Sequence, residues 1–407
     1  MSNSTRFARE TDTRSAAAVV VARQPILDHV ERIVGFELLT PPEAHPHEAT
    51  AIVLAQAIAD IGLHKLVGDR PAHVDVTREF LLLVNPLPLD PQRVVLELAA
   101  DEHVDDELLA VLRDVRAAGF RLALDDYREA TASDALLDLA ESVKIDVRDR
   151  SEDEIEGDVN AARGRGLNVI ADGVPDRQVY GFCRGLGFDA FQGQYFAEPV
   201  VVQGASVPTY RLRALSMLSA GESATFEQLE RVIAEDPGLS LKLVKLANSA
   251  FYGGRAPVGT IRQALMALGT TTVRRWAALL VLAGINDRPS HLLETGLLRA
   301  RLCELVSART PGAEADRGFT VGLFSVVDAL LGLRMPDLLA ELPFDERTTR
   351  ALAEREGPEG KVLAGVLAYE AGEFEKCVAT GVSLVDIAHA YGEALDWTDG
   401  ALVQLSN

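Results

Sequence analysis

Short apolar runs that each end in an acidic residue recur through the first half of the chain. Helical patterns separate these runs, and the runs themselves have the length and composition of buried strands. The acids at their ends are Glu37, Asp75, Glu97, Asp125 with Asp126, Asp146 and Asp172. Strands that alternate with helices predict a mainly parallel sheet. If the sheet closes into a barrel, the carboxyl ends of its strands meet on one face, and the acids form a ring there.

Such a ring predicts a site for one or two divalent cations, because hard cations take carboxylate oxygens. Cations held in this way serve phosphoryl chemistry or phosphate binding. The run from Arg121 to Tyr127 is the clearest case, since it places Asp125 and Asp126 side by side. The alternative is that an acid of this kind caps the helix that follows. Capping explains each acid separately, but it does not explain why acids recur at the ends of the runs.

The hydrophobic pattern changes at about Val201, after which strand-like runs disappear and amphipathic helices follow one another. We therefore expect a disordered tail over residues 1–17, a barrel domain over 18–202 and a helical domain over 203–407. The segment from Val202 to Pro208 is the expected linker. Two helix starts are marked in the helical half, a capping box at Thr225–Gln228 and an N-cap with proline at Asp236–Pro237.

Within the barrel half, three local predictions concern the ends of elements. A first strand is expected over Ala18–Ile26, ending at Pro25, with a polar turn leading into the second strand as a hairpin. A helix is expected over Ser133–Ser142. The last strand is expected over Ala190–Phe196.

Charge and composition exclude several function classes. The net charge of −21 and the pI near 4.8 argue against broad electrostatic binding to nucleic acid or to an anionic membrane. The longest strongly apolar run, Trp276 to Ile285, is too short to span a bilayer. Cys183, Cys303 and Cys377 lie far apart, which fits buried thiols in a reducing compartment. We expect a cytoplasmic protein without a membrane partner.

Seven short motifs follow one another along the barrel half. They are Gln24-Pro25-Ile26, Glu37-Leu38-Leu39, Glu97 in LELAADE, Asp125-Asp126, Lys144-Ile145-Asp146, Ala171-Asp172-Gly173-Val174, and Gln192 to Phe196 with Pro199. In this order they resemble the EAL family of cyclic di-GMP phosphodiesterases. The resemblance implies a shortened TIM-like α/β barrel with one reversed strand.

The same resemblance assigns roles to individual residues. It implies that Mg²⁺ or Mn²⁺ is held by the metal ligands Glu37, Asp75, Glu97, Asp125 and Asp126. It implies that Lys144, Gln192 and Asp172 occupy the catalytic positions, with Gln24 and Pro199 at the ligand, cyclic di-GMP. Lys144 keeps two interpretations, a cation of the catalytic site or a counter-ion for the acids around it.

The helical half resembles the HDOD family, relatives of the HD phosphohydrolases that lack their metal site. The match starts at Asp236-Pro237-Gly238-Leu239, continues through Leu246 to Tyr252 and Ile261 to Gly269, and reaches Tyr369-Glu370. The all-α HDOD domain is implied to bind a protein partner, which the sequence does not identify. A homodimer stays an open alternative.

Four positions depart from active EAL enzymes. Asp75 stands in place of an Asn ligand and Asp172 in place of a Glu. Pro41 replaces an Arg that would grip a phosphate, and Arg128–Thr131 replaces a glycine-rich loop. We therefore expect a signalling regulator whose EAL domain is degenerate, either binding cyclic di-GMP or vestigial.

Two other functions stay open. The retained acids favour an active metal-dependent phosphodiesterase that produces the linear dinucleotide. Phe226 to Asn248 can also be interpreted as a DNA-binding helix-turn-helix with Lys242 and Lys245 on its second helix. Two lysines are more often a solvated face, and Asn248 more often binds backbone groups than a ligand, so nucleic acid is the least expected partner.

Overall fold

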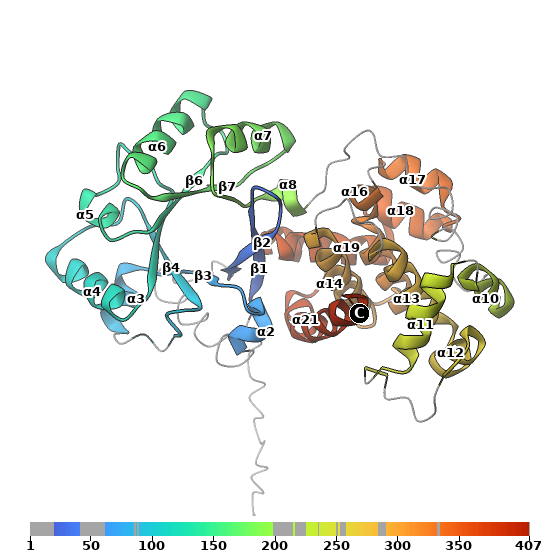
Figure 1. Ribbon diagram of the computed structural model, residues 1–407. Coiled ribbons are helices and arrows are strands. Elements are labelled where there is room, and N and C mark those ends of the chain that lie inside the picture. The colour runs from blue at the N-terminus through green and yellow to red at the C-terminus, as the bar shows by residue number, and fades with distance from the viewer. Residues whose placement is uncertain are drawn as a thin grey trace, which may run out of the picture.

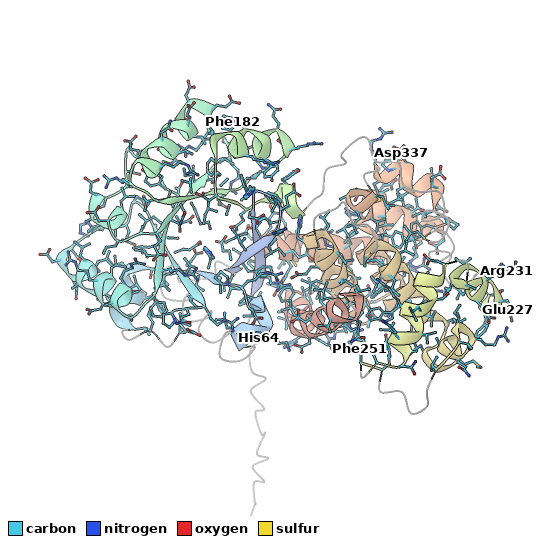
Figure 2. All side chains as sticks on the ribbon, viewed as in Figure 1. His64, Phe182, Glu227, Arg231, Phe251 and Asp337 are labelled. Carbon is cyan, nitrogen blue, oxygen red and sulfur yellow. The ribbon has the colours of Figure 1, made fainter. Side chains whose placement is uncertain are left out.

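The barrel and the helical half lie side by side in a computed structural model of the chain (Figure 1). The structure describes residues 20–40, 62–84, 87, 89–197, 215, 225–234, 236–249, 251–252, 258–283, 290–331 and 334–406. Pro41, Pro199, the expected tail and the expected linker lie outside these residues. Side chains fill the interior of both halves (Figure 2).

Eight strands close into a barrel in chain order, β1 to β8. Strand β1 is antiparallel to both of its neighbours, β2 and β8, whereas all other pairs are parallel. This confirms the TIM-like barrel with one reversed strand. The strands are β1 Ala22–Asp28, β2 Ile33–Leu39, β3 Ala72–Asp75, β4 Val94–Ala99, β5 Arg121–Asp125, β6 Ser142–Asp146, β7 Asn168–Asp172 and β8 Ala190–Phe191.

Helices follow most strands of the barrel and cover its outside (Figure 1). Local capping sets several of their ends: the Asp105 side chain accepts from the Leu108 N–H, and Ser151 with Glu154 forms a capping box. The helices are α2 Leu63–Val67, α3 Arg78–Leu83, α4 Asp106–Ala117, α5 Asp134–Leu137, α6 Glu152–Gly164, α7 Arg177–Leu186 and α8 Gln194–Ala197.

The predicted hairpin of the first two strands is confirmed, but the three predicted element ends are wrong. Strand β1 continues past Pro25 to Asp28, and this is tolerated because β8 pairs only with Leu27 and Asp28. Helix α5 stops at Leu137, and the chain rejoins the sheet through the Glu141 N–H, which donates to the Leu122 carbonyl.

Strand β8 ends at Phe191 because the chain turns at Gly193, whose φ is 145°. A Cβ on Gly193 would lie 2.3 Å from the Val174 nitrogen, so only glycine fits this turn.

The second half is entirely helical in its described residues, as the HDOD resemblance implied. The predicted caps at Thr225 and Asp236 are present. Two glycines of α15, Gly318 and Gly322, face the α14 backbone so closely that a Cβ on either would clash with it. The helices are α10 Phe226–Ala234, α11 Pro237–Ala247, α12 Ile261–Leu268, α13 Thr270–Ala283, α14 Ser290–Ser307, α15 Ala315–Phe324, α16 Val327–Leu331, α17 Met335–Glu341, α18 Glu346–Glu354, α19 Gly357–Glu370, α20 Phe374–Ala379 and α21 Leu384–Ser406.

Two features of this half bear on the alternatives. The Asn248 side chain closes a loop onto backbone, donating to the Val258 carbonyl at 2.7 Å and accepting from the Val258 N–H at 2.8 Å. No single helix among the described residues is long and apolar enough to cross a bilayer. Helices α12 and α13 pass that test only as a pair, which is bent by 120°.

Buried polar contacts join the two halves. Arg23 on β1 donates to Glu294 on α14 at 3.1 Å, with both side chains largely buried. The Tyr369 hydroxyl on α19 donates to the Val21 carbonyl at 2.7 Å. The β1–β2 side of the barrel is therefore the side that the helical half covers (Figure 1).

Candidate functional site

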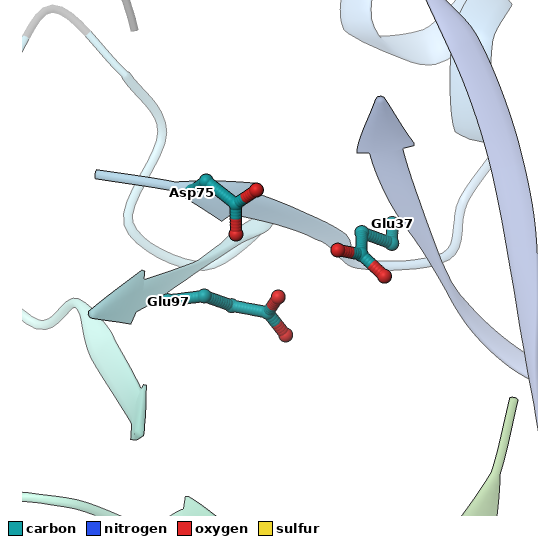
Figure 3. Close-up of side chains that lie close together, drawn as sticks. All are labelled: Glu37, Asp75 and Glu97. Atoms are coloured by element: carbon teal, nitrogen blue, oxygen red, sulfur yellow. The ribbon is translucent and has the colours of Figure 1, made fainter. Parts of the chain in front are cut away.

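Three carboxylates converge at the carboxyl ends of β2, β3 and β4. Glu37, Asp75 and Glu97 each offer an oxygen that lies within 4.8 Å of the other two (Figure 3). The strand register brings them together, because Asp75 is paired with Glu97 across β3 and β4, and Glu37 with His73 across β2 and β3. The parallel barrel thus produces the acidic cluster that the sequence predicted.

Lys144 lies among these acids and is only 1% exposed. Its Nζ is 3.0 Å from Glu37 Oε2, 3.0 Å from Glu97 Oε2 and 3.7 Å from Asp125 Oδ1. A single ammonium group therefore forms ion pairs with three carboxylates. Lys144 is a counter-ion of the cluster in this arrangement, and a catalytic role remains a prediction.

His73 also binds the cluster, and the sequence analysis did not single it out as a site residue. Its Nδ1 lies 2.6 Å from Glu97 Oε1. The signal was present in the sequence, since His73 stands two positions before Asp75 on the same strand, and side chains at this spacing share one face. Glu97 is thus held by Lys144 on one oxygen and by His73 on the other.

Burial and charge set the protonation of the cluster. Burial raises the pKa of Glu37 to about 7, although Lys144 opposes the shift. Burial, with the neighbouring acids Glu37 and Glu97, raises the pKa of Asp75 well above its ordinary value. Burial acts upward on the pKa of Glu97 too, but Lys144 and His73 outweigh it and hold that pKa at about 2. Burial thus favours the protonated form of Glu37 and of Asp75 relative to an exposed carboxyl.

Asp125 and Asp172 lie at the edge of the cluster, at the ends of β5 and β7. Burial raises the pKa of both carboxyls, and Lys144 is the main opposing charge. Both have the placement that the sequence predicted for ring acids.

Asp126 and Asp146 face other partners. The Asp126 side chain is 64% exposed and lies 3.6 Å from the Arg128 guanidinium. Asp146 is bound by Arg148 at 2.6 Å. The structure therefore does not bring Asp126 to the three converging acids, and its role as a metal ligand remains a prediction.

Gln192 connects the cluster to the predicted ligand residue Gln24. Its Nε2 donates to Gln24 Oε1 at 2.6 Å and also to Glu37 Oε2. Its Oε1 is buried without a hydrogen-bond partner among the described residues. A buried acceptor without a donor is costly, so this oxygen marks a place where a ligand donor fits.

A pocket of about 610 Å³ lies at these residues. Glu37, Asp172 and Gln192 line it from the barrel, the part called its floor below, and residues of α19 and α20 line it from the helical half. The volume falls in the range of small-molecule sites. The contribution of the helical half was not predicted, because nothing in the sequence of α19 marks it as part of a site.

The donor set fits a hard divalent cation. The ligands are carboxylate oxygens, which suit Mg²⁺, Mn²⁺ or Ca²⁺ rather than softer metals. Glu37, Asp75 and Glu97 would hold the cation, with Asp125 and Asp172 nearby to complete its coordination.

Comparison with known families matches both halves of the chain. The EAL domain matches residues 66–199 and the HDOD domain matches residues 205–356. The protein YuxH of Bacillus subtilis is 26% identical over 93% of this chain and 98% of its own length. Cyclic di-GMP phosphodiesterase CdgJ of Vibrio cholerae is 27% identical over 93% of this chain and 92% of its own length.

Among solved structures, a calcium and cyclic di-GMP complex of Klebsiella pneumoniae BlrP1 is similar to part of the chain. It is 22% identical, and the match covers 43% of this chain and 54% of that chain with a TM-score of 0.37.

Proposed function

The chain belongs to the proteins in which an EAL domain is followed by an HDOD domain, and from this premise we propose that it is a cyclic di-GMP signalling protein. Its barrel binds cyclic di-GMP together with a divalent cation at Glu37, Asp75 and Glu97. Turnover is slow or absent, and the HDOD domain passes the state of the site to a protein partner. The observation that carries this proposal is the convergence of three carboxylates, one of which, Glu37, lines a pocket large enough for a nucleotide.

The cation would supply charge neutralisation and polarisation at a phosphate oxygen. The residues of the chain add to this in two ways. Lys144 keeps two of the ligand acids in place before the cation arrives. Gln192 orients Glu37 and keeps an acceptor free for a donor group of the ligand.

Slow turnover is supported by the position of Asp126. A two-metal mechanism clamps the attacking and leaving oxygens of the phosphate at once, and this requires ligands for both cations. Asp126 lies in solvent beside Arg128 instead of at the cluster. The replacements at positions 41 and 128–131 support the same proposal.

Hydrolysis of cyclic di-GMP to the linear dinucleotide is the second candidate. It is favoured by Lys144 and Gln192, which both contact Glu37, and by the name of the Vibrio cholerae relative, which is a cyclic di-GMP phosphodiesterase. DNA binding is not proposed, because Asn248 is bound to backbone and the net charge is strongly negative.

The test combines binding and turnover on the full chain. Calorimetry with cyclic di-GMP is run in Ca²⁺, in Mg²⁺ and in EDTA, and chromatography of the products is run in Mg²⁺ and Mn²⁺. Glu37→Gln removes one ligand charge, and Glu156→Gln, an exposed glutamate on α6, is the matched control.

We expect cation-dependent binding that is lost in Glu37→Gln but kept in Glu156→Gln, with little linear product. Rapid formation of linear product by the wild type, abolished in Glu37→Gln, would establish the phosphodiesterase instead. Absence of binding in every cation would refute both candidates.

The helical half is proposed to dock a partner without chemistry of its own. Among the described residues, the acidic cluster of the barrel is the one group suited to a metal. A variant with Glu37, Asp75 and Glu97 all changed to amides should therefore hold no stoichiometric metal by elemental analysis. One transition-metal ion per chain in that variant would contradict the proposal.

A further inference from the structure

One wall of the ligand pocket belongs to the helical half. Ala364, Leu367, Ala368 and Ala371 line it from α19 and the residue after it. They stand at i, i+3, i+4 and i+7, which is the spacing of a single helix face. This face is apolar, whereas the floor of the pocket includes the carboxylates of Glu37 and Asp172 together with Gln192.

The wall is fixed to the barrel at its end. Gly372 follows α19 with a φ of 73°, and a Cβ there would lie 2.7 Å from Leu39 Cδ1. Leu39 itself is two residues after Glu37 on β2. The Tyr369 hydroxyl holds the same turn of α19 to the Val21 carbonyl. The distance between the apolar wall and the acidic floor is thus set by direct contacts.

The two surfaces suit the two parts of a nucleotide. A phosphodiester, which can only accept hydrogen bonds, is recognised at the floor through a cation. The unpartnered oxygen of Gln192 accepts instead from a hydroxyl or N–H group elsewhere on the ligand. A planar base is recognised by apolar contact, which α19 and the neighbouring Phe374 provide. Lys376 and Arg148 reach the rim of the same pocket from opposite halves.

We propose that the pocket is a two-domain site, in which the α19 face of the helical domain forms the wall for a base of the dinucleotide whose phosphodiester is bound at the barrel floor. This proposal rests on the proposed function and adds that the HDOD domain is part of the ligand site. Ligand binding then stabilises the contact between the two domains, so the helical domain detects the ligand directly.

The test uses the full chain and two readouts. Hydrogen exchange, measured by mass spectrometry, compares the chain with and without cyclic di-GMP in Ca²⁺. Calorimetry measures the Kd of the wild type and of Ala364→Leu, which extends an aliphatic side chain into the pocket. Ala353→Leu is the control, because Ala353 is exposed on α18 and does not line the pocket.

We expect the ligand to protect amides of residues 361–376 as well as those of 190–197. Ala364→Leu should weaken binding by about 10- to 200-fold, as a misfit of this size does in an apolar pocket, and Ala353→Leu should leave the Kd unchanged. Protection of the barrel alone, with the same Kd in both variants, would overturn the two-domain site and leave the proposed function standing. No protection and no binding in the wild type would overturn both.

Discussion

Lys144 is the residue that supplies positive charge to the acidic cluster. It is buried and lies within 3.0 Å of two carboxylate oxygens, so its loss leaves acids together without a counter-ion. A buried ion pair that loses one partner costs about 3–5 kcal/mol. At the same time Lys144 competes with a cation for the same oxygens.

Lys144→Met should therefore lower the stability of the metal-free protein by about 3–5 kcal/mol. It should also enlarge the rise in Tm that Ca²⁺ or Mg²⁺ produces at pH 8, because binding of the cation stabilises the folded state by mass action. Thermal unfolding in EDTA and in each cation measures both effects. Lys361→Met, at an exposed position of α19, should change neither, and a smaller metal response in Lys144→Met would contradict this account.

The protonation of Glu37 predicts an unusual dependence of stability on pH. Its pKa is raised from 4.5 to about 7 by burial, so between these values the folded state holds a proton that the unfolded chain has released. The free energy of unfolding should then fall as pH rises from 5 to 8, by roughly 3 kcal/mol for this group, since one pKa unit corresponds to about 1.4 kcal/mol. Asp75, Asp125 and Asp172 shift in the same direction.

Denaturant unfolding in EDTA at several pH values checks this slope. Glu37→Gln should flatten it, because the amide does not titrate. Saturating Ca²⁺ should reverse it in the wild type, because the cation replaces the proton. A wild-type curve in EDTA that rises between pH 5 and 8 would show that the burial of Glu37 does not control its protonation.

At the scale of elements, the β1–β2 hairpin contributes side chains both to the site and to the interface with the helical half. Gln24 and Glu37 point to the site, whereas Arg23 and Phe36 stand beside them on the helical side, with the Arg23 guanidinium 4.2 Å from the Phe36 ring. The alternation of side chains along a strand produces this division. A ligand that shifts β1 or β2 would therefore also shift Arg23, which is paired with Glu294 on α14.

The Arg23–Glu294 ion pair joins the two halves, and we expect its loss to lower the free energy of unfolding strongly. Arg23→Met leaves Glu294 buried beside Arg70, which is 3.6 Å away, and should destabilise the protein by about 3–5 kcal/mol. Adding Glu294→Leu should recover more than half of that loss, since a buried pair is often replaceable by apolar residues. Denaturant unfolding measures both. Arg334→Met, which removes an exposed pair with Asp337, is the control and should leave the denaturation midpoint almost unchanged, because exposed ion pairs contribute little to stability.

Elements also show what sequence reasoning could reach. The alternation of strands and helices, the first hairpin and the acids at the strand ends followed from the hydrophobic pattern, whereas the closed barrel with its reversed strand was implied by the EAL resemblance. Once the barrel closes, the strand ends meet on one face, and so the acids converge. The end of β8 did not follow, since it depends on the close approach of Gly193 to Val174, two segments of different motifs. The α19 wall was unpredictable for the same reason, because its four positions form an ordinary apolar helix face until the tertiary fold brings them into the same pocket as Glu37.

At the scale of the whole molecule, the two halves share one continuous hydrophobic core. We therefore expect the two halves to stay together without a covalent connection through residues 202–208, the predicted linker. The chain should unfold in a single thermal transition, with both halves losing structure at once. Separate calorimetric transitions for the two halves would contradict this.

The same reasoning predicts that the halves stay associated after the linker is cut. A protease site inserted between residues 202 and 208 should yield two fragments that co-elute in size-exclusion chromatography.

Gly372→Leu should separate the two fragments, because the new side chain meets Leu39 of the barrel. Gly381→Leu is the matched control: Gly381 also has a positive φ, 80°, but has open space around it. Both variants therefore carry the same backbone strain, and only one of them places atoms in the interface. If the fragments co-eluted in both variants, or separated in both, the contact between Gly372 and Leu39 would not be what holds the helical half on the barrel. The boundary itself is tested by limited proteolysis of the unaltered chain: cuts within 18–202 and none at 202–208 would show that the domain boundary lies elsewhere.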